Sequence, residues 1–183
     1  MLVYRCFAWS RRARAADRDG ALWFPRELQG EGRHDNPAVY GCLYAADRPV
    51  SALVEQLARF RGQRLTAGML VRRGLPLALA TIELPDDGSV VDLDDPAVLS
   101  AHGLRPSVVA TRTRTVTQPQ ALALFRRHPA AAALRWWSTY EALWANYTVF
   151  DRAATHLRLA EIARLRLDDS ALGEAADLLG ISA

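Results

Sequence analysis

Three residues between positions 33 and 55 have side chains suited to binding or chemistry: Arg33, Tyr44 and Glu55. An arginine binds planar anions such as phosphate and carboxylate through paired hydrogen bonds. A tyrosine ring can stack on another planar ring, and a glutamate supplies a negative charge. The question is whether these three side chains belong to one site or lie separately on a strand and a helix.

Tyr44 lies in "VYGCLYAA" (residues 39–46), a run that predicts a central strand. Side chains alternate between the two faces of a strand, so Tyr44 shares a face with Tyr40 and Cys42. That face either lines a pocket or fills the core, and the pattern alone favours the core. Gly41 within the run indicates a bulge or a close approach of the backbone.

Glu55 lies in a predicted helix that begins at Pro49, ends near Arg61 and is capped by Asp47. The apolar residues of this segment recur at the spacing of a buried stripe, and Glu55 falls beside the stripe. The simplest interpretation is an exposed glutamate paired with Arg59, four residues later. Periodicity alone favours this interpretation over a catalytic one.

The rest of the chain mixes strands and helices in irregular order, which predicts an α+β fold. The segment 10–36 reads as a long loop, and loops of this length are often functional. The strands at 77–85 and 89–94 flank "DDG" and are expected to be joined by a tight connection. Further strands are expected at 2–8, 134–138 and 146–151, and helices at 94–103 (capped by Asp94 or Asp95), 118–128, 156–166 and 170–179.

The chain has 183 residues, 50% of them hydrophobic and 23% charged, which predicts one folded domain. All 23 basic residues are arginines, and the net charge is +3. This composition suits an anionic ligand, but the coding bias of a GC-rich genome explains it equally well. The arginines lie along the whole chain, which argues against a dedicated nucleic-acid stripe, and "SRRAR" (10–14) reads as a solvated turn.

No signal peptide and no membrane-spanning run is recognisable, so a cytoplasmic location is expected. Cys6 and Cys42 lie in apolar runs and are expected to be buried free thiols. The four histidines show no metal-ligand spacing, and no metal site is expected. The terminal "SALGEAADLLGIS" looks like the first half of a helix-turn-helix without its recognition helix, so a packing or partner-binding helix is expected.

Two blocks of the sequence resemble the RES domain family. "GRHDNPAVYGCLYAADRPVSALVEQLARFR" has the family's glycine-arginine pair at Gly32-Arg33, its "LYxA" strand at 43–46 and its "AxxE" helix ending at Glu55. "LRWWSTYEALWANYTVFDRA" (134–153) resembles the second block. There Ser138 would be the third signature residue, and Asn146 would lie in the closing strand.

The resemblance implies one RES-like domain over residues 1–183, with signature blocks at about 30–61 and 134–153 and a helical tail at about 156–180. It also implies an α+β fold like that of diphtheria-toxin-type ADP-ribosyltransferases, with mixed sheets and flanking helices. Two positions depart from the family pattern. His34 stands where most members carry tryptophan or phenylalanine, and Trp137 is bulkier than usual.

Family members are toxins of RES-Xre toxin-antitoxin pairs that degrade NAD+ by phosphorolysis or hydrolysis. The resemblance therefore implies an NAD+ phosphorylase or glycohydrolase with an Xre-type antitoxin as partner. NAD+ would be the substrate and inorganic phosphate the co-substrate, with no further cofactor. No nucleic-acid or membrane contact is expected, and self-association stays open. The alternatives are a protein ADP-ribosyltransferase and a non-catalytic partner-binding domain.

The resemblance also implies a role for each signature residue. Cleavage of the nicotinamide-ribose bond develops positive charge on the sugar, which Glu55 would stabilise. Arg33 would hold pyrophosphate or inorganic phosphate, and Tyr44 would stack on or orient nicotinamide. Ser138 would hydrogen-bond ribose or phosphate, and Asn146 would help to bind NAD+.

Overall fold

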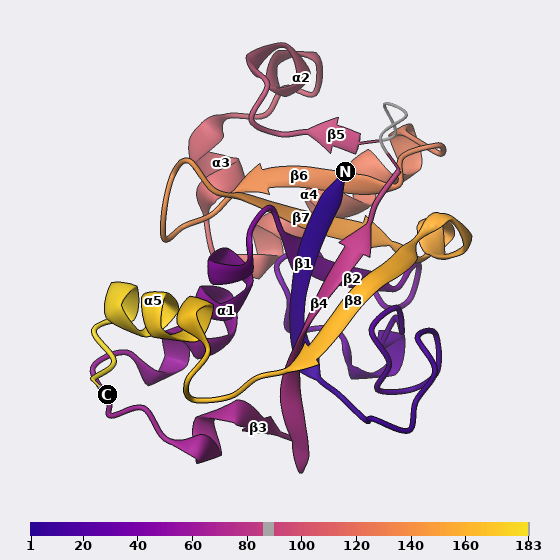
Figure 1. Cartoon of the computed structure of the whole chain (residues 1–183). Coiled ribbons are helices and arrows are strands. Elements are labelled where there is room, and N and C mark those ends of the chain that lie inside the picture. Colours follow the sequence, from indigo (N-terminus) through magenta and orange to yellow (C-terminus); the bar gives the residue numbers. More distant parts are fainter. Residues whose placement is uncertain (86–89, 183) are drawn as a thin grey trace. The chain divides into compact units, whose positions relative to one another are not determined.

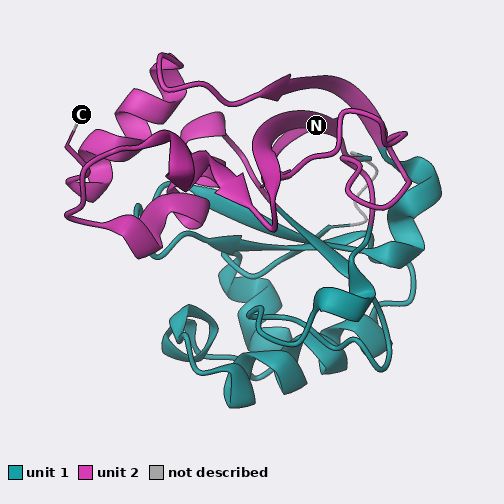
Figure 2. Ribbon diagram, turned by 90° about the horizontal axis from the view of Figure 1, so that it is seen from below, with its two compact units in different colours: residues 1, 24–44, 85–157 teal, residues 2–23, 45–84, 158–183 magenta. Residues whose placement is uncertain are grey.

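The computed structural model describes residues 1–85 and 90–182 (Figure 1). The chain forms two compact units, each assembled from segments that are separate in the sequence (Figure 2). The first unit comprises residue 1 and residues 24–44 and 85–157. The second unit comprises residues 2–23, 45–84 and 158–183.

The second unit is built on an antiparallel sheet centred on β4. Its strands are β1 (Leu2–Ala8), β3 (Val71–Arg72), β4 (Leu75–Glu83) and β8 (Arg158–Arg164). β1 pairs with β4 from Leu2 opposite Glu83 to Ala8 opposite Leu77. β8 and β3 pair with β4 as well, and Tyr4 of β1 pairs with Ala46 of β2. β4 thus pairs with each of the other three strands of this unit, and the four form one antiparallel sheet.

Two helices of the second unit, α1 (Pro49–Leu57) and α5 (Ser170–Leu179), pack against each other (Figure 1). α1 buries an apolar stripe that includes Leu53 and Leu57, and α5 buries Leu172 and Leu179. α5 is thus a packing helix, one of the two roles expected from the sequence. After α5, the backbone of Ser182 hydrogen-bonds with residues 63 and 65.

The first unit contains strands in the order β2, β7, β6, β5. Their bounds are β2 (Cys42–Ala46), which runs on into the second unit, β5 (Val90–Asp92), β6 (Ala133–Trp137) and β7 (Ala145–Phe150). β6 and β7 are antiparallel, whereas β5 and β6 are parallel. The α-helices of this unit are α2 (Pro96–Ala101), α3 (Pro106–Ala110) and α4 (Arg114–Arg127).

Short 3-10 helices connect several of these elements. They are η1 (Arg26–Leu28), η2 (Ala58–Phe60), η3 (Ala67–Leu70) and η4 (Asp151–His156). The core of the first unit contains a trio of aromatic rings, Tyr40, Phe125 and Phe150, whose centres are 4.4 to 4.9 Å apart. Phe150 ends β7, Tyr40 lies just before β2, and Phe125 belongs to α4. Contacts among the three rings therefore pack β7 and the segment before β2 against α4.

Several predicted elements are confirmed. β1 has the predicted bounds, and β6 and β7 each begin one residue before their predicted starts. α2 begins with Asp95 as its cap, because the carboxylate accepts a hydrogen bond from the N–H of Ala97. Cys6 and Cys42 are buried free thiols, as expected. The α+β class is confirmed as well, and the likeness to diphtheria-toxin-type enzymes stays a prediction.

Other predictions were wrong. Residues 156–166 were expected to be helical, but 158–164 form β8, because β4 offers an edge for pairing. β2 begins only at Cys42, since residues 36–40 form a turn in which the N–H groups of Val39 and Tyr40 share one carbonyl oxygen. The α1 cap is Arg48 rather than Asp47.

The strands β4 and β5 do not pair with each other, and the predicted tight connection at residues 86–88 lies outside the described residues. α3 was missed, and α4 begins at Arg114, four residues before the predicted start. None of the described helices is long and apolar enough to cross a membrane.

Candidate active site

The turn that carries Arg33 is held by the buried carboxylate of Asp35. One oxygen of Asp35 accepts hydrogen bonds from the backbone N–H groups of Gly30 and Gly32, at 2.8 and 2.7 Å. The other oxygen accepts the hydroxyl hydrogen of Tyr44 at 2.7 Å. Because each of these donors belongs to the turn or to β2, the carboxylate fixes the backbone on both sides of Arg33.

Gly32 has no space for a side chain. A Cβ atom at this position would lie 2.5 Å from an oxygen of Asp35 and 2.5 Å from the hydroxyl of Tyr44. The glycine before Arg33 is therefore required by close packing. This gives a physical reason for the Gly32-Arg33 pair noted in the sequence.

The guanidinium of Arg33 lies over the indole ring of Trp136, with 4.6 Å between the guanidinium carbon and the ring centre. Its Nη1 donates to the carbonyl oxygen of Val109 at 2.8 Å and to that of Thr111. The backbone carbonyl of Arg33 accepts the hydroxyl hydrogen of Thr117 at 2.6 Å. Ring stacking and hydrogen bonds thus define the orientation of a partly buried arginine.

His34 supports Trp136 from inside the core. Its ring meets the indole edge to face at 5.4 Å, and its Nδ1 lies 2.8 Å from Oγ1 of Thr148. Trp136 donates its indole N–H to the same oxygen at 3.2 Å. Burial, followed by the nearby charge of Arg33, lowers the pKa of His34 to about 3. The ring is therefore neutral near pH 7 and packs against the indole of Trp136.

The β6–β7 hairpin presents Trp136, Ser138 and Asn146 on one face. Trp136 lies opposite Asn146 in the register of the two strands, and residues opposite each other share a face. Ser138 follows two residues after Trp136 and continues the pairing, because its N–H donates to the carbonyl of Trp144 at 2.8 Å. Since the guanidinium of Arg33 lies over Trp136, it belongs to this face too.

Ser138 and Asn146 are both buried, each 3% exposed. The hydroxyl of Ser138 accepts a hydrogen bond from the backbone N–H of Tyr140 at 3.2 Å, which orders the start of the hairpin turn. The first unit thus brings together Arg33, Ser138 and Asn146, three of the five predicted site residues.

Tyr44, the fourth, is also in the first unit, but its hydroxyl is engaged internally. The hydroxyl donates to Asp35 at 2.7 Å and accepts the N–H of His34 at 2.9 Å. Burial, with Cys42 and Asp35 nearby, raises the pKa of Tyr44 well above its usual range. The ring packs against the core of the unit. The observed contacts make Tyr44 a support of the Arg33 turn, and its stacking on nicotinamide stays a prediction.

Glu55, the fifth, lies in the second unit, on the exposed side of α1. The interpretation of the sequence pattern as an exposed glutamate beside a buried stripe is confirmed in this respect. Its participation in one site with Arg33 stays a prediction.

Sequence reasoning missed a second arginine near Ser138. Arg112 donates from Nη2 to the hydroxyl of Thr139 at 2.9 Å, and its guanidinium lies 5.4 Å from the ring centre of Tyr140. Trp136, whose indole ring lies under the guanidinium of Arg33, was missed as well. The sequence holds no periodic signal for either role, because both depend on contacts between distant segments.

The donor set of this face suits an anion held by guanidinium and hydroxyl groups. Across the described residues, no group of three or more histidine, cysteine, aspartate or glutamate side chains could hold a metal ion. The family model described as RES domain matches residues 2–168, across both units. The chain belongs to the RES domain family.

The fold of this RES chain is similar to one in the crystal structure of the M. tuberculosis MbcT–MbcA toxin–antitoxin complex. The TM-score is 0.62 at 20% sequence identity, over 97% of this chain and 87% of that chain. Among the curated proteins compared, none matches the chain. The membership confirms the resemblance drawn from the two sequence blocks. Arg33 and Ser138, which the resemblance predicts to be signature residues, lie in the first unit of this RES chain.

Proposed function

We propose that this RES chain cleaves the nicotinamide-ribose bond of NAD+ by phosphorolysis, or by hydrolysis, and acts as the toxin of a toxin-antitoxin pair. Membership of the family and the likeness to a toxin-antitoxin structure support the proposal. The observation that carries it is the guanidinium of Arg33, fixed over Trp136 on the hairpin face that also holds Ser138 and Asn146.

The proposed reaction transfers ADP-ribose from nicotinamide to phosphate. The bond between the ribose C1 and the pyridine nitrogen breaks, and its electron pair leaves with nicotinamide, which becomes neutral. An oxygen of inorganic phosphate then forms the new bond to the same carbon, giving ADP-ribose 1-phosphate. In hydrolysis, water takes the place of phosphate and loses a proton.

Arg33 would bind the phosphate groups in this reaction. A guanidinium whose orientation is set by an indole and two carbonyl oxygens loses little conformational freedom when an anion binds. Phosphate matches its planar donors through charge-assisted hydrogen bonds. A lysine at this position could supply the charge but not the stacked plane.

Ser138 and Asn146 would bind the ribose or phosphate oxygens next to Arg33, since a hydroxyl and an amide both donate and accept hydrogen bonds. Glu55 would stabilise the positive charge that develops on the ribose as the bond breaks. The ring of Tyr44 would orient nicotinamide, while its hydroxyl holds Asp35.

The first experiment incubates the purified protein with NAD+, with and without inorganic phosphate, and follows nicotinamide and the ribosyl product by NMR. We expect phosphate-dependent release of nicotinamide together with a phosphorylated ADP-ribose. Release without phosphate would identify hydrolysis instead. Folded, partner-free protein that releases no nicotinamide in either condition would overturn the enzyme proposal and support a non-catalytic, partner-binding domain.

Arg33→Lys tests the observation on which the proposal depends, the guanidinium of Arg33 over Trp136. We expect turnover to fall by about 100-fold, since one point charge replaces a stacked, forked donor. Arg105→Lys makes the same chemical change at an exposed arginine of the same unit and should leave turnover unchanged. Near-normal turnover in Arg33→Lys would remove the phosphate-binding role from Arg33.

An enzyme that depletes NAD+ has to be neutralised in the cell that makes it. We therefore propose an Xre-type antitoxin as its protein partner. Expression of the chain alone should stop growth and lower cellular NAD+, and co-expression of the antitoxin should restore both. Growth arrest without a fall in NAD+ would point to a protein acceptor for ADP-ribose.

A further inference from the structure

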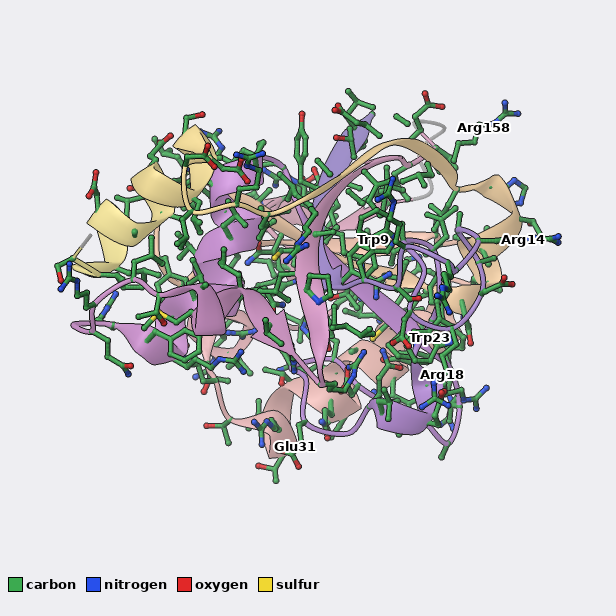
Figure 3. The ribbon with its side chains drawn as sticks, turned by 60° about the horizontal axis from the view of Figure 1, so that its bottom comes forward. Trp9, Arg14, Arg18, Trp23, Glu31 and Arg158 are labelled. Atoms are coloured by element: carbon green, nitrogen blue, oxygen red, sulfur yellow. The ribbon has the colours of Figure 1, made fainter. Side chains whose placement is uncertain are left out.

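Residues 9–23 of the second unit form a loop that is folded by its own backbone hydrogen bonds, and Figure 3 labels four of its side chains. The N–H of Ser10 donates to the carbonyl of Asp19 at 3.1 Å, and that of Leu22 to the carbonyl of Ala15 at 2.7 Å. Gly20 is required here, because a Cβ atom would lie 2.1 Å from a backbone oxygen of Arg14. The loop is therefore a compact, internally hydrogen-bonded surface element.

This loop presents arginines without carboxylate partners. Arg11, Arg12, Arg14 and Arg18 are all exposed, and no ion pair is found for any of them among the described residues. The two carboxylates of the loop have partners other than these guanidinium groups. Asp17 accepts the backbone N–H of Arg14 at 3.3 Å, and Asp19 pairs with Arg73 at 3.0 Å.

The pair between Asp19 and Arg73 joins the loop to a second group of arginines. Arg72 precedes Arg73 at the end of β3 and donates to the side chain of Gln56 at 2.9 Å. Burial, and then the positive charges of Arg59 and Arg73, lower the pKa of Arg72. Between residues 56 and 82 the sequence has no aspartate or glutamate. Arg59, Arg72 and Arg73 thus lie near one another, and Arg73 is joined to the loop through Asp19.

Two tryptophans stand at the ends of the loop. Trp9 and Trp23 are both partly exposed, and the guanidinium of Arg18 lies 5.7 Å from the ring centre of Trp23. Figure 3 shows both tryptophans with Arg14 and Arg18 on the same side of the ribbon. Arginines and indole rings therefore share one surface, which we call the arginine–tryptophan loop (residues 9–23).

We propose that the arginine–tryptophan loop binds single-stranded nucleic acid, with its arginines on phosphates and its tryptophans against bases. Forked guanidinium donors match phosphate oxygens, and aromatic rings stack on unpaired bases whatever their sequence. An acidic peptide would pair with the arginines but offer the indole rings no planar partner. The inference is independent of the proposed NAD+ reaction, because none of these residues was assigned to it.

The proposal runs against the expectation from sequence, which found the arginines spread along the chain. That expectation did not include contacts between distant segments. The fold places the arginines at 72 and 73 beside those of residues 11–18 through one ion pair. A surface charge pattern of this kind is visible only after folding.

The test measures binding of fluorescent 20-nucleotide oligo(dT) and oligo(U) to the full chain by anisotropy, at 50 to 200 mM salt. We expect binding by either oligonucleotide that weakens steeply with salt. The triple variant Arg11→Gln, Arg12→Gln, Arg14→Gln should bind at least about tenfold more weakly and show a shallower salt dependence. Trp23→Leu should bind about tenfold more weakly with an unchanged salt dependence, because stacking releases no counterions.

A matched control changes the net charge equally at exposed arginines of the first unit: Arg105→Gln, Arg126→Gln, Arg127→Gln. This variant should bind as the wild type does. Circular dichroism should show that all variants stay folded, since every substituted arginine is exposed and Trp23 is partly exposed. An equal loss of oligonucleotide affinity in the two triple variants would overturn the proposal in favour of general charge attraction.

Two further outcomes would also overturn it. One is the absence of oligonucleotide binding even at 50 mM salt. The other is that poly-glutamate at equal charge concentration displaces the oligonucleotide while Trp23→Leu leaves oligonucleotide binding unchanged. That combination would identify an acidic protein as the ligand. NAD+ turnover of the triple variant is measured in parallel. The outcome for oligonucleotide binding can then be told apart from the outcome for the proposed NAD+ reaction.

Discussion

Gly32 offers a test of the turn at the scale of single residues. Gly32→Ala would place a methyl group 2.5 Å from both the Asp35 carboxylate and the Tyr44 hydroxyl. We expect the free energy of unfolding to fall by about 2–3 kcal/mol, because the buried hydrogen bonds around Asp35 have to open. NAD+ turnover should fall with it, since the turn orients Arg33.

The matched control is Gly173→Ala in α5, where a Cβ atom would meet nothing within 4 Å. Alanine favours a helix over glycine, so this variant should gain about 0.5–1 kcal/mol. Urea denaturation measures the free energy of unfolding of both variants. A loss at position 32 no larger than that of an ordinary surface substitution would show that the turn is not tightly packed.

His34 makes stability depend on pH. Its pKa is lowered from 6.5 to about 3 in the folded chain, so between these values the unfolded chain takes up a proton that the folded chain refuses. The stability linked to this residue is present above pH 6.5 and is lost as the pH falls. We expect this residue to lower the free energy of unfolding of the wild type by about 2 kcal/mol between pH 7 and pH 5.

His34→Phe should lose correspondingly less stability over the same interval, because the ring that refuses the proton is gone. Urea denaturation at the two pH values gives the difference. His156→Phe replaces an exposed histidine and should keep the pH dependence of the wild type. If His34→Phe kept it as well, the buried ring would not be its source.

At the scale of elements, the contact between α1 and α5 can be tested with two leucines of one helix. Leu172 is completely buried, whereas Leu178 is 56% exposed. Leu172→Ala should lower the free energy of unfolding by about 2–4 kcal/mol through lost burial and a cavity. Leu178→Ala should change it by less than about 0.5 kcal/mol. Comparable losses at both positions would contradict the packing of α5.

The elements also show where local sequence ceases to be informative. The segment 158–164 (RLAEIAR) is made mostly of arginine, alanine, leucine and glutamate, which suits a helix by propensity, yet it forms β8 along an edge of β4. Pairing with a neighbouring strand supplied backbone partners that outweigh a small local preference. By contrast, α5 and α2 carry strong local signals, an apolar stripe in one and an aspartate cap in the other, and both were predicted correctly.

At the scale of the whole molecule, β2 connects the two units. Residues 42–44 belong to the first unit and residues 45–46 to the second, and each unit is made of separated segments. Neither unit can unfold completely while β2 stays intact. We therefore expect one cooperative transition, as a single domain would show.

Native-state hydrogen exchange can test this expectation. The most protected amides of β1, in the second unit, and of β7, in the first, should open with the same free energy and the same dependence on denaturant. Distinct opening energies for the two strands would establish two independently unfolding units.

The chemical types of the site residues and their local settings follow from the amino-acid sequence alone. Gly32-Arg33, Glu55 and Ser138 stand in blocks that identify the family, and the strands and helices with clear periodicity or caps followed from short-range preferences. Such features depend on residues a few positions apart, so they survive without knowledge of the fold.

The contacts that these residues make depend on the folded chain. It placed Trp136 under the guanidinium of Arg33, engaged the hydroxyl of Tyr44 with Asp35, and brought Arg73 to the loop that carries Arg18. Each contact joins segments separated by several to about one hundred residues. Their pairing depends on strand order and on the packing of the core, which no local pattern encodes.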